Sequence, residues 1–328
     1  MTVLVTGGSG FVGVNVVQAL LERGEDVVSL DAGDLPAGAA EALARHKTRL
    51  TLERGSVLDA AALRRVFERY TIDRVLHAAA VTSGPAREGR DPASIVDVNL
   101  HGTINVLDCA RAHGVKRVLY VGSGAAYGES LYRLPRLYET TPSIPTTLYS
   151  ITKHAAERMC MRLKALWDID VACVRLGTVI GPWERDTGAR DNFGTHSQLA
   201  AMAAAGKRAI LTSREIRRDW VYSGDVAQAL AGLLLAPSLR YALYNVSSGV
   251  AWHAPIARWC DALARTFPRF MFTTAGANED ANIWYTDRDR GLMDTGRLEQ
   301  EIGFAATSME TAYAEYLEWI VRTPRFYA

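Results

Sequence analysis

The sequence lacks the features that mark several classes of protein. Its 328 residues include four cysteines, none in C-x-x-C spacing, which favours reduced thiols in a cytoplasmic protein over a disulfide scaffold. The 37 basic and 36 acidic residues nearly cancel, so charge gives no reason to expect a nucleic acid or an anionic membrane as partner. No apolar run approaches the ~18 residues of a membrane span, and no basic segment typical of a signal peptide precedes the first apolar run.

Metal-ligand clusters, repeats and low-complexity linkers are missing as well. His77 and His196 have no partners at metal spacing, so we expect no metal ion. The length is large for one domain and allows a nucleotide-binding domain with a smaller lobe. Length and composition therefore agree with a soluble, cytoplasmic enzyme.

A short run of largely β-branched residues opens the chain and leads directly into glycines. Residues 2–6 predict a buried first strand, and the apolar spacing over 11–23 predicts a helix. Glycines between a strand and a helix permit a tight turn and close approach of the backbone to a pyrophosphate, which the helix N-terminus then binds. The residues predicted to contact a dinucleotide here are Gly7, Gly10, Phe11, Val12 and Gly13.

The second predicted strand, residues 26–31, ends in a carboxylate. Asp31 lies 18 positions after Gly13, close to the ~20-residue spacing of an acid that hydrogen-bonds the adenosine ribose. Such a carboxylate repels a 2′-phosphate, and no arginine follows in residues 32–34 to accept one. We therefore predict NAD, rather than NADP, as the cofactor. The alternative for Asp31 is an ordinary turn residue at a strand end.

Strand and helix patterns alternate through residues 1–176. Strands are predicted at 2–6, 26–31, 48–53, 74–78, 117–123 and 170–176, and helices at 11–23, 59–70, 91–113 and 146–167. This alternation predicts an α/β protein with a doubly wound parallel sheet, the Rossmann arrangement, whose ligands bind at the carboxyl ends of the strands.

The alternation breaks after residue 176. Residues 177–220 are rich in glycine, arginine, aspartate and aromatic residues, as in a substrate-facing loop region. Later elements are predicted as strands near Tyr222 and at 243–246, and as helices at 223–235, 256–266, 295–302 and 309–321. We predict an NAD-binding domain with the catalytic residues at 1–176 and a smaller C-terminal α/β substrate-binding lobe at 177–328. Residues from about 220 to 250 are expected to return to the first domain.

Tyr149 and Lys153 stand four positions apart in a predicted helix, so they share one face of it. A free tyrosine, with a pKa near ~10, is a poor base at neutral pH, but a fixed positive charge within a few ångströms favours the phenolate. Taken alone, the pair is more typical of a solvated helix face. Next to a dinucleotide site, it predicts a proton-transfer group.

Further motifs occur along the chain. They are residues 77–80 (His-Ala-Ala-Ala), Asn99 within 98–103, Ser123 with Tyr127 and Gly128, Arg175 ahead of Gly181 and Pro182, and residues 218–222 (Arg-Asp-Trp-Val-Tyr). With the glycine turn, Asp31 and the Tyr149/Lys153 pair, they resemble the extended short-chain dehydrogenase/reductase family, in particular its NAD-dependent sugar epimerases and dehydratases. The resemblance covers nearly the whole chain, with the motifs in the same order.

The resemblance implies a role for each of these residues. Tyr149 would be the general base that takes a proton from a substrate hydroxyl while hydride passes to the nicotinamide. Lys153 would hold the nicotinamide ribose and lower the pKa of Tyr149. Ser123 would hydrogen-bond the reacting oxygen, although a serine there could also cap a strand end, and Asn99 would support the site. Cofactor contacts are also implied for Ser56, Val57, Ala78, Ala79, Ala80 and Asn99, and substrate contacts for Ser83, Ser123, Thr178 and Arg218.

Departures from the family pattern narrow the reaction. Sugar-nucleotide dehydratases of this group carry an Asp-Glu pair after the catalytic Ser or Thr, and this chain has Gly124 and Ala125 there. Neither residue can transfer a proton, so elimination and decarboxylation are disfavoured. Oxidation of a secondary alcohol, or oxidation and re-reduction as in epimerisation, remains. A non-catalytic NAD-binding sensor is the other alternative, which the intact Ser123, Tyr149 and Lys153 disfavour.

Other departures concern the substrate. Thr178 stands where nucleotide-sugar enzymes have an Asn that helps hold the diphosphate, and Ser56 stands where an Asp often accepts from adenine. Arginines that could clamp an anion are Arg185, Arg190, Arg214, Arg217 and, first among them, Arg218. We therefore expect a polyhydroxylated anionic substrate, a sugar acid or sugar phosphate, with a nucleotide sugar as the alternative. Trp183 and Trp220 could stack on a sugar or base, or pack in the core.

The predicted helical regions 91–113 and 146–167 carry apolar residues on more than one side. In the family that the chain resembles, these helices pair across a two-fold axis. The resemblance therefore implies a homodimer joined through a four-helix bundle.

Overall fold

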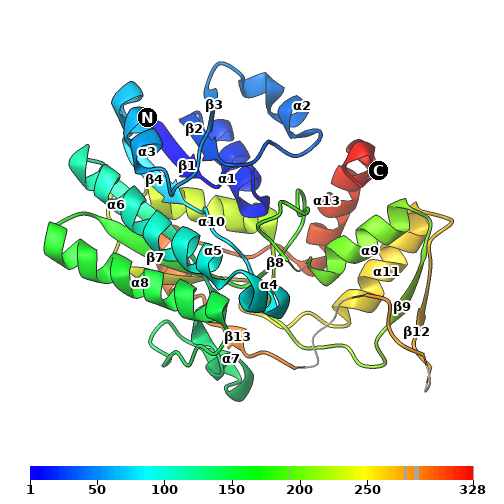
Figure 1. The fold of residues 1–328 in the computed structure, drawn as a ribbon. Helices are drawn as coiled ribbons and strands as arrows, with labels where there is room; N and C mark the ends of the chain where they lie inside the picture. Colours follow the sequence, from blue (N-terminus) through cyan, green and yellow to red (C-terminus); the bar gives the residue numbers. More distant parts are fainter. Residues whose placement is uncertain (192, 277–278, 284–287, 328) are drawn as a thin grey trace.

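A computed structural model describes residues 1–191, 193–276, 279–283 and 288–327 of the chain. Its largest feature is a seven-stranded sheet in which all neighbouring strands run parallel (Figure 1). The strands lie in the order β11 (Leu243–Val246), β7 (Val171–Leu176), β5 (Arg117–Ser123), β4 (Arg74–His77), β1 (Thr2–Thr6), β2 (Asp26–Asp31) and β3 (Leu50–Arg54). The predicted doubly wound parallel sheet is thus confirmed. The strand order reverses between β1 and β4, and such a switch point opens a crevice for a ligand at the carboxyl ends of the strands.

Helices cover both faces of this sheet (Figure 1). The helices α1 (Phe11–Glu22) and α10 (Ser223–Leu235) pack together on one face, and α3 (Ala60–Arg69), α6 (Gly102–Ala112) and α8 (Leu148–Trp167) cover the other. Residues of β1 alternate between the two cores, because Val3 and Val5 lie under α1 and α10 while Leu4 lies in the opposite core. All three are fully buried, and each such side chain contributes about 1.5–3 kcal/mol to stability.

Two glycines let the first turn close against its neighbours. Gly7 has a φ of 73°, and a Cβ atom there would lie 2.6 Å from the backbone nitrogen of Ala79. A Cβ atom on Gly13 would lie 2.0 Å from the carbonyl oxygen of Gly7. A larger residue at either position would therefore force the turn away from α1 or from the segment that follows β4.

The structure corrects several predicted elements. Residues 177–220, predicted as a loop region, contain the strands β8 (Thr178–Ile180) and β9 (Arg208–Leu211) and the helix α9 (Thr195–Ala204). Residues 91–113 are divided into α5 (Pro92–Val96), a π-helical turn at Asp97–His101, and α6. β8 pairs with β10 (Trp220–Tyr222) and β9 with β12 (Met271–Thr274). These strands are short and their partners lie far along the chain, so local periodicity did not reveal them.

Several shorter elements complete the chain and were also not predicted. They are α2 (Ala39–Leu43), α4 (Pro85–Arg90), α7 (Ser130–Arg133), β6 (Arg136–Leu137), β13 (Leu292–Met293), and 3-10 turns at Ala44–His46, Gly124–Tyr127 and Pro324–Phe326. Among the described residues, no helix combines the length and the hydropathy that a membrane span needs.

A second core lies beside the sheet and is formed by α9, α11 (Pro255–Thr266) and α13 (Met309–Arg322) (Figure 1). Aromatic residues fill it, with the rings of Trp259 and Tyr316 stacked at a centroid distance of 5.0 Å. By contrast, α12 (Gly296–Ile302) packs on α10, and β11 is a strand of the main sheet. The proposed domain boundary at residue 176 remains a prediction.

A buried ion pair ties α8 to the sheet. The guanidinium of Arg175, on β7, donates to both carboxylate oxygens of Glu157, on α8, at 2.7 Å each. Both side chains are 3% exposed, and the guanidinium also lies 4.2 Å from the centre of the Tyr127 ring. Because the carboxylate compensates a charge that has no access to water, loss of one partner leaves the other charge buried and unpaired.

We expect Glu157→Ala to lower the free energy of unfolding by about 3–5 kcal/mol, because it leaves the Arg175 guanidinium buried without its carboxylate partner. Urea titration followed by circular dichroism would measure the loss. The matched control is Glu318→Ala, which removes an exposed ion pair with Arg322 and should change stability little. Equal stability of the two variants would contradict the assigned role of the buried pair.

Candidate active site

Two cavities lie at the carboxyl ends of the sheet strands and share Ala78 and Ala80 in their walls. The smaller cavity measures about 240 Å³ and is bordered by the glycine turn and the end of β2. The larger cavity measures about 370 Å³ and lies between β5, α8 and the segments that follow β7 and precede β13. Most predicted site residues are divided between these two cavities.

The smaller cavity is lined by most of the residues predicted to bind the nucleotide half of the cofactor. These are Gly7, Gly10, Asp31, Ser56, Val57, Ala78, Ala79 and Ala80. The helix α1 begins at its edge with neither a side-chain cap nor an acidic residue in its first turn, so its N-terminal N–H groups suit a phosphate. Gly13 lines neither cavity, because it lies at the contact between α1 and the turn.

Asp31 is held in place by the backbone. Its Oδ2 accepts from the N–H of Ser9 and its Oδ1 from the N–H of Gly33, both at 2.9 Å. A carboxylate oxygen can accept more than one hydrogen bond, and Asp31 lines the smaller cavity, so the predicted contact with a ribose hydroxyl is compatible with this geometry. We propose this contact as the reason for a preference for NAD.

Two arginines, neither of which was predicted to lie near Asp31, are close to it in the structure. Arg54, which is opposite Asp31 in the sheet, forms an exposed ion pair with Asp34 at 3.0 Å. Arg185, a candidate for the substrate anion, lines the smaller cavity and donates to the carbonyl oxygen of Asp34. The chain after β8 thus places Arg185 beside the nucleotide site, away from Arg218.

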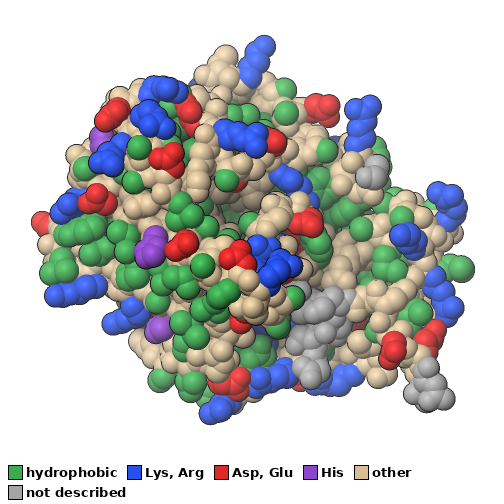
Figure 2. Space-filling model, in the orientation of Figure 1, with side chains coloured by type: hydrophobic (Ala, Val, Ile, Leu, Met, Phe, Trp, Pro, Cys, Tyr) green, Lys and Arg blue, Asp and Glu red, His purple; other side chains and the backbone are tan. Residues whose placement is uncertain are grey.

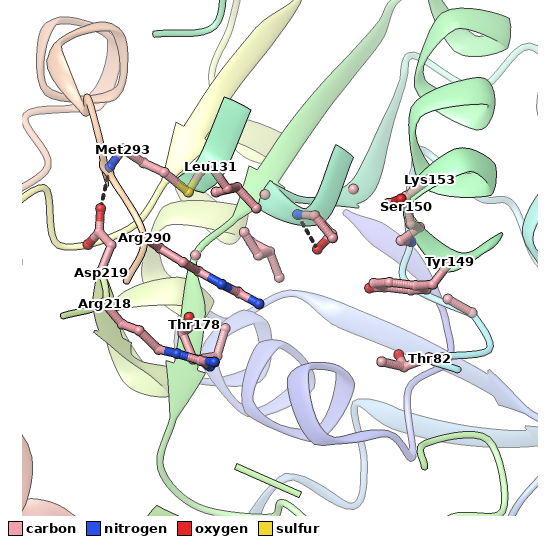
Figure 3. Close-up of a pocket in the computed structure, with 18 of the residues that line it drawn as sticks. Thr82, Leu131, Tyr149, Ser150, Lys153, Thr178, Arg218, Asp219, Arg290 and Met293 are labelled. Atoms are coloured by element: carbon pink, nitrogen blue, oxygen red, sulfur yellow. Dashed lines mark hydrogen bonds between the residues drawn. The ribbon is translucent and has the colours of Figure 1, made fainter. Parts of the chain in front are cut away.

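Tyr149, Lys153 and Ser123 line the larger cavity together, as predicted for a catalytic group. Figure 3 shows Tyr149 and Lys153 on the same helix at one side of the cavity. Lys153 is 4% exposed, its ammonium donates to the Val121 carbonyl at 2.8 Å, and burial lowers its pKa to about 8. Ser123 Oγ accepts from the N–H of Ala125 at 3.1 Å, so Ser123 caps the turn after β5 and also faces the cavity.

A capping box fixes where α8 begins and therefore where its tyrosine points. Thr147 Oγ1 accepts from the N–H of Ser150 at 3.2 Å, and Ser150 Oγ accepts from the N–H of Thr147 at 3.0 Å. The helix starts at Leu148, which puts Tyr149 in its first turn and Lys153 one turn later on the same side.

Two other predicted residues lie behind the cavity walls. Asn99, on the π-helical turn, accepts from the N–H of Val81 at 2.9 Å and donates to Thr152 at 3.0 Å. It is buried and lines neither cavity, so it links the segment after β4 to α8. Ser83 donates to Glu88 and also lines neither cavity, whereas its neighbour Thr82 lines the larger one.

The other polar candidates differ in position. Thr178, Arg190 and Arg218 line the larger cavity, while Arg214 and Arg217 contact Asp289 outside it. The tryptophans pack in the core. Trp183 lies edge-on to Trp319, and Trp220 lies edge-on to His196.

The histidine of the His-Ala-Ala-Ala motif lies inside the protein. His77 is buried between the hydroxyls of Thr6, at 2.7 Å, and Thr103, at 3.0 Å. Burial, with a smaller effect of Lys153, lowers the pKa of His77 to about 3, so the ring is neutral at physiological pH. Among the described residues, no group of three His, Cys, Asp or Glu side chains has an arrangement that could hold a metal.

Sequence reasoning missed Arg290, which also lines the larger cavity. Its backbone N–H donates to the Arg217 carbonyl at 2.9 Å, and its guanidinium lies 5.7 Å from the centre of the Tyr132 ring. Figure 3 shows the guanidinium groups of Arg218 and Arg290 entering the cavity opposite Tyr149. In the sequence this arginine has no feature that separates it from the other arginines.

Asp219 brings these two arginines together. Its buried carboxylate accepts from the N–H of Met293 at 2.5 Å and from the N–H of Gly249 at 3.2 Å (Figure 3). Burial raises the pKa of Asp219, the effect of these hydrogen bonds being smaller. The contact ties the segment of Arg290 to that of Arg218, across 74 residues of sequence.

The fold and the two cavities define a dinucleotide-binding α/β protein with a tyrosine-lysine-serine group beside the cofactor groove. The sequence matches the NAD dependent epimerase/dehydratase family over residues 3–247, and the chain belongs to this family. The resemblance to extended short-chain dehydrogenase/reductases is therefore confirmed, and the cofactor of the family is NAD.

Among curated relatives, the chain is 34% identical to the UDP-glucose 4-epimerase of Halalkalibacterium halodurans, over 55% of this chain and 52% of that protein. It is 29% identical to UDP-glucuronate 4-epimerase 3 of Arabidopsis thaliana, over 71% and 54% respectively. The chain thus spans about half the length of these relatives. The fold is similar to the crystal structure of a Thermus thermophilus UDP-glucose 4-epimerase in complex with NAD, with a TM-score of 0.76, 26% identity, and coverage of 100% of this chain and 99% of that chain.

We expect Tyr149→Phe to slow reduction of bound NAD by at least ~100-fold, because the ring stays but the oxygen predicted to accept the substrate proton is gone. NAD affinity should remain close to that of the unchanged protein. Stopped-flow absorbance of NADH and equilibrium NAD titration would measure the two. Tyr138→Phe alters a half-exposed tyrosine and is the control. Full turnover by Tyr149→Phe would refute its assignment as the base.

Proposed function

We propose that this protein is an NAD-dependent epimerase of nucleotide sugars, which oxidises a secondary alcohol of the sugar and restores it with the opposite configuration. The observation that carries the proposal is the pair of guanidinium groups, from Arg218 and Arg290, opposite Tyr149 in the larger cavity (Figure 3). A ligand that joins the two sides must carry an anion at one end and a hydroxyl at the other.

The arginine pair suits a diphosphate better than a single carboxylate. Arg218 is 7% exposed and lies over the Trp220 ring at 5.7 Å. Arg290 has a buried Nε with no hydrogen-bond acceptor among the described residues, so it offers a donor to a ligand. Guanidinium groups bind phosphate oxygens through paired hydrogen bonds, and two of them match two linked phosphates.

The relatives also support a nucleotide sugar. Both curated relatives are named as 4-epimerases of UDP-linked sugars, and so is the protein of the similar crystal structure. This favours the alternative over the sugar acid or sugar phosphate that the sequence analysis put first. Thr178, which was given weight against a diphosphate, lines the same cavity and retains a hydroxyl donor.

The lining of the larger cavity disfavours elimination of water. Ser123 is followed by Gly124 and Ala125, which carry no acid. Among the described lining residues, Asp219 is the sole carboxylate, and backbone N–H groups already occupy its oxygens. A carboxylate placed to shuttle the second proton of a dehydration is therefore lacking in the described part of the cavity.

The side chains at the other end of the cavity serve proton transfer. When bound, NAD supplies a hydride acceptor beside the sugar. The deprotonated oxygen of Tyr149 takes the proton of the sugar alcohol, and the hydroxyl formed in this way returns that proton to the carbonyl oxygen in the reverse step. The buried Lys153 ammonium lies on the same side of α8 as Tyr149, and the Ser123 hydroxyl orients the reacting oxygen.

We expect Arg290→Leu and Arg218→Leu each to weaken binding of UDP by roughly 10- to 100-fold, because each removes charge-assisted hydrogen bonds to phosphate. Isothermal titration with UDP would measure this, and Arg322→Leu, on the exposed side of α13, is the control.

The epimerase proposal itself is tested by incubating the NAD-loaded protein with UDP- and dTDP-sugars, sugar acids and sugar phosphates. Conversion confined to sugar acids or sugar phosphates would refute the nucleotide-sugar proposal.

We also propose that two copies of the chain pair through α6 and α8. These helices expose large apolar side chains, with Ile104 39%, Ile151 44% and Leu166 56% exposed. Figure 2 shows hydrophobic side chains gathered over the place where Figure 1 has α6 and α8. A second copy related by a two-fold axis would cover the same face on both partners.

A double substitution, Ile104→Glu with Ile151→Glu, should convert the dimer to a single chain of 35.9 kDa, because paired carboxylates would repel across the axis. Light scattering after size-exclusion chromatography measures the mass. Met271→Glu, at a 64% exposed site on β12, is the control. A single-chain mass for the unchanged protein would refute the dimer.

A further inference from the structure

The segment of residues 184–191, which follows β8, crosses the edge of the smaller cavity. Arg185, Thr187 and Ala189 line that cavity, together with Asp31 and the glycine turn from the sheet side. Arg190 of the same segment lines the larger cavity and forms an ion pair with Glu184 at 2.6 Å. We call this segment the strap.

One end of the strap is fixed to the chain after β4. The N–H of Thr82 donates to the Ala189 carbonyl at 2.7 Å, and the N–H of Asp191 donates to the Thr82 carbonyl at 3.1 Å. The Arg87 guanidinium, on α4, donates to both oxygens of Asp191, with Nε at 2.8 and 3.0 Å, and also to the Gly188 carbonyl at 2.7 Å. We call the Arg87–Asp191 pair the latch.

The latch is an ion pair that is largely shielded from water. The side chains of Arg87 and Asp191 are 15% and 21% exposed, so water competes weakly for them. The N–H of Gly84 adds a hydrogen bond to Asp191 at 2.9 Å. A bidentate arginine-carboxylate pair of this geometry resists opening more than a single exposed contact does.

The other end of the strap is fixed near β2. Arg185 donates to the carbonyl oxygen of Asp34, three residues beyond the ribose candidate Asp31. Just before the strap, Trp183 packs against Phe11 at the start of α1. The strap therefore spans the smaller cavity from the β2 side to the β4 side, and a nucleotide in the cavity would lie beneath it.

We propose that the strap encloses the nucleotide half of NAD and that the latch between Arg87 and Asp191 sets how fast NAD leaves. The Arg185 Nε is buried with no hydrogen-bond acceptor among the described residues and lies in the cavity wall, where the diphosphate of NAD would supply one. NAD then leaves after the strap detaches, which requires the latch to break.

Slow release has a chemical consequence, which rests on the proposed epimerase function. An epimerase must keep the reduced cofactor with the oxidised sugar until the sugar is reduced again. A latched strap meets this requirement, whereas a dehydrogenase needs its cofactor to exchange in each turnover. The contacts at both ends of the strap therefore favour a protein that keeps its NAD bound between turnovers.

The test measures release of NAD and needs no sugar. The full-length protein is loaded with radiolabelled NAD and mixed with a large excess of unlabelled NAD, and the label retained on the protein is followed in time. Arg87→Ala and Asp191→Asn should each release NAD roughly 10- to 100-fold faster than the unchanged protein. The double variant should be no faster than the faster single one, because both substitutions break the same contact.

Arg90→Ala is the matched control, since Arg90 is an exposed arginine on the same helix α4 with no hydrogen bond to the strap among the described residues. Arg185→Leu provides a second route, because it loosens the opposite end of the strap and removes the proposed contact with the diphosphate, while the latch stays intact. Thermal unfolding of each variant checks that it is folded. Release at the unchanged rate from folded Arg87→Ala and Arg185→Leu proteins would overturn the proposal. If release of NAD depends on the latch but the protein has no activity on nucleotide sugars, the role of the strap is supported and the proposed function is refuted.

Discussion

The close approach of three backbone segments at Gly7 and Gly13 is the constraint on which the nucleotide site depends. At these positions a single methyl group would fall within 2.0 to 2.6 Å of backbone atoms. The absence of side chains lets the turn after β1 lie against the segment after β4 and brings the N-terminus of α1 to the cavity edge. The glycine turn and the segment after β4 both line the smaller cavity, so the shape of the proposed nucleotide site depends on this contact.

A second set of contacts joins segments that are far apart in the sequence and that line the proposed substrate site. The buried carboxylate of Asp219 holds the segments of Arg218 and Arg290 by backbone hydrogen bonds, and the Arg175–Glu157 pair holds α8 on the sheet. Each set of contacts centres on a buried carboxylate that accepts more than one hydrogen bond. The proposed substrate would therefore bridge two walls of the larger cavity, one with Arg218 and Arg290 and one with Tyr149, Lys153 and Ser123.

The strap connects the cofactor chemistry to the choice of reaction. Residues 184–191 touch both cavities, so closure over NAD and the lining of the sugar site involve one continuous segment. The proposed enclosure of NAD by the strap, the two arginines that line the larger cavity, and the lack of an acid after Ser123 all agree with the proposed reversible oxidation of one bound sugar. Each observation comes from a different part of the chain, so their agreement supports epimerisation over a reaction that exchanges NAD.

The parallel sheet, the glycine turn, Asp31 and the Tyr149/Lys153 pair could all be predicted from the sequence, because strand alternation, helix spacing and motif distances are local properties of the chain. The sequence also placed Ser123, Thr178 and Arg218 in one functional group, which the larger cavity brings together. The tertiary structure alone decided that Arg290 faces Tyr149, that Arg185 lies at the nucleotide site, and that Arg87 pairs with Asp191 across 104 residues. These contacts join residues far apart in the chain, where no periodic pattern marks the partner, and they form because the tertiary fold brings the segments after β4, β8 and β10 to the same edge of the sheet.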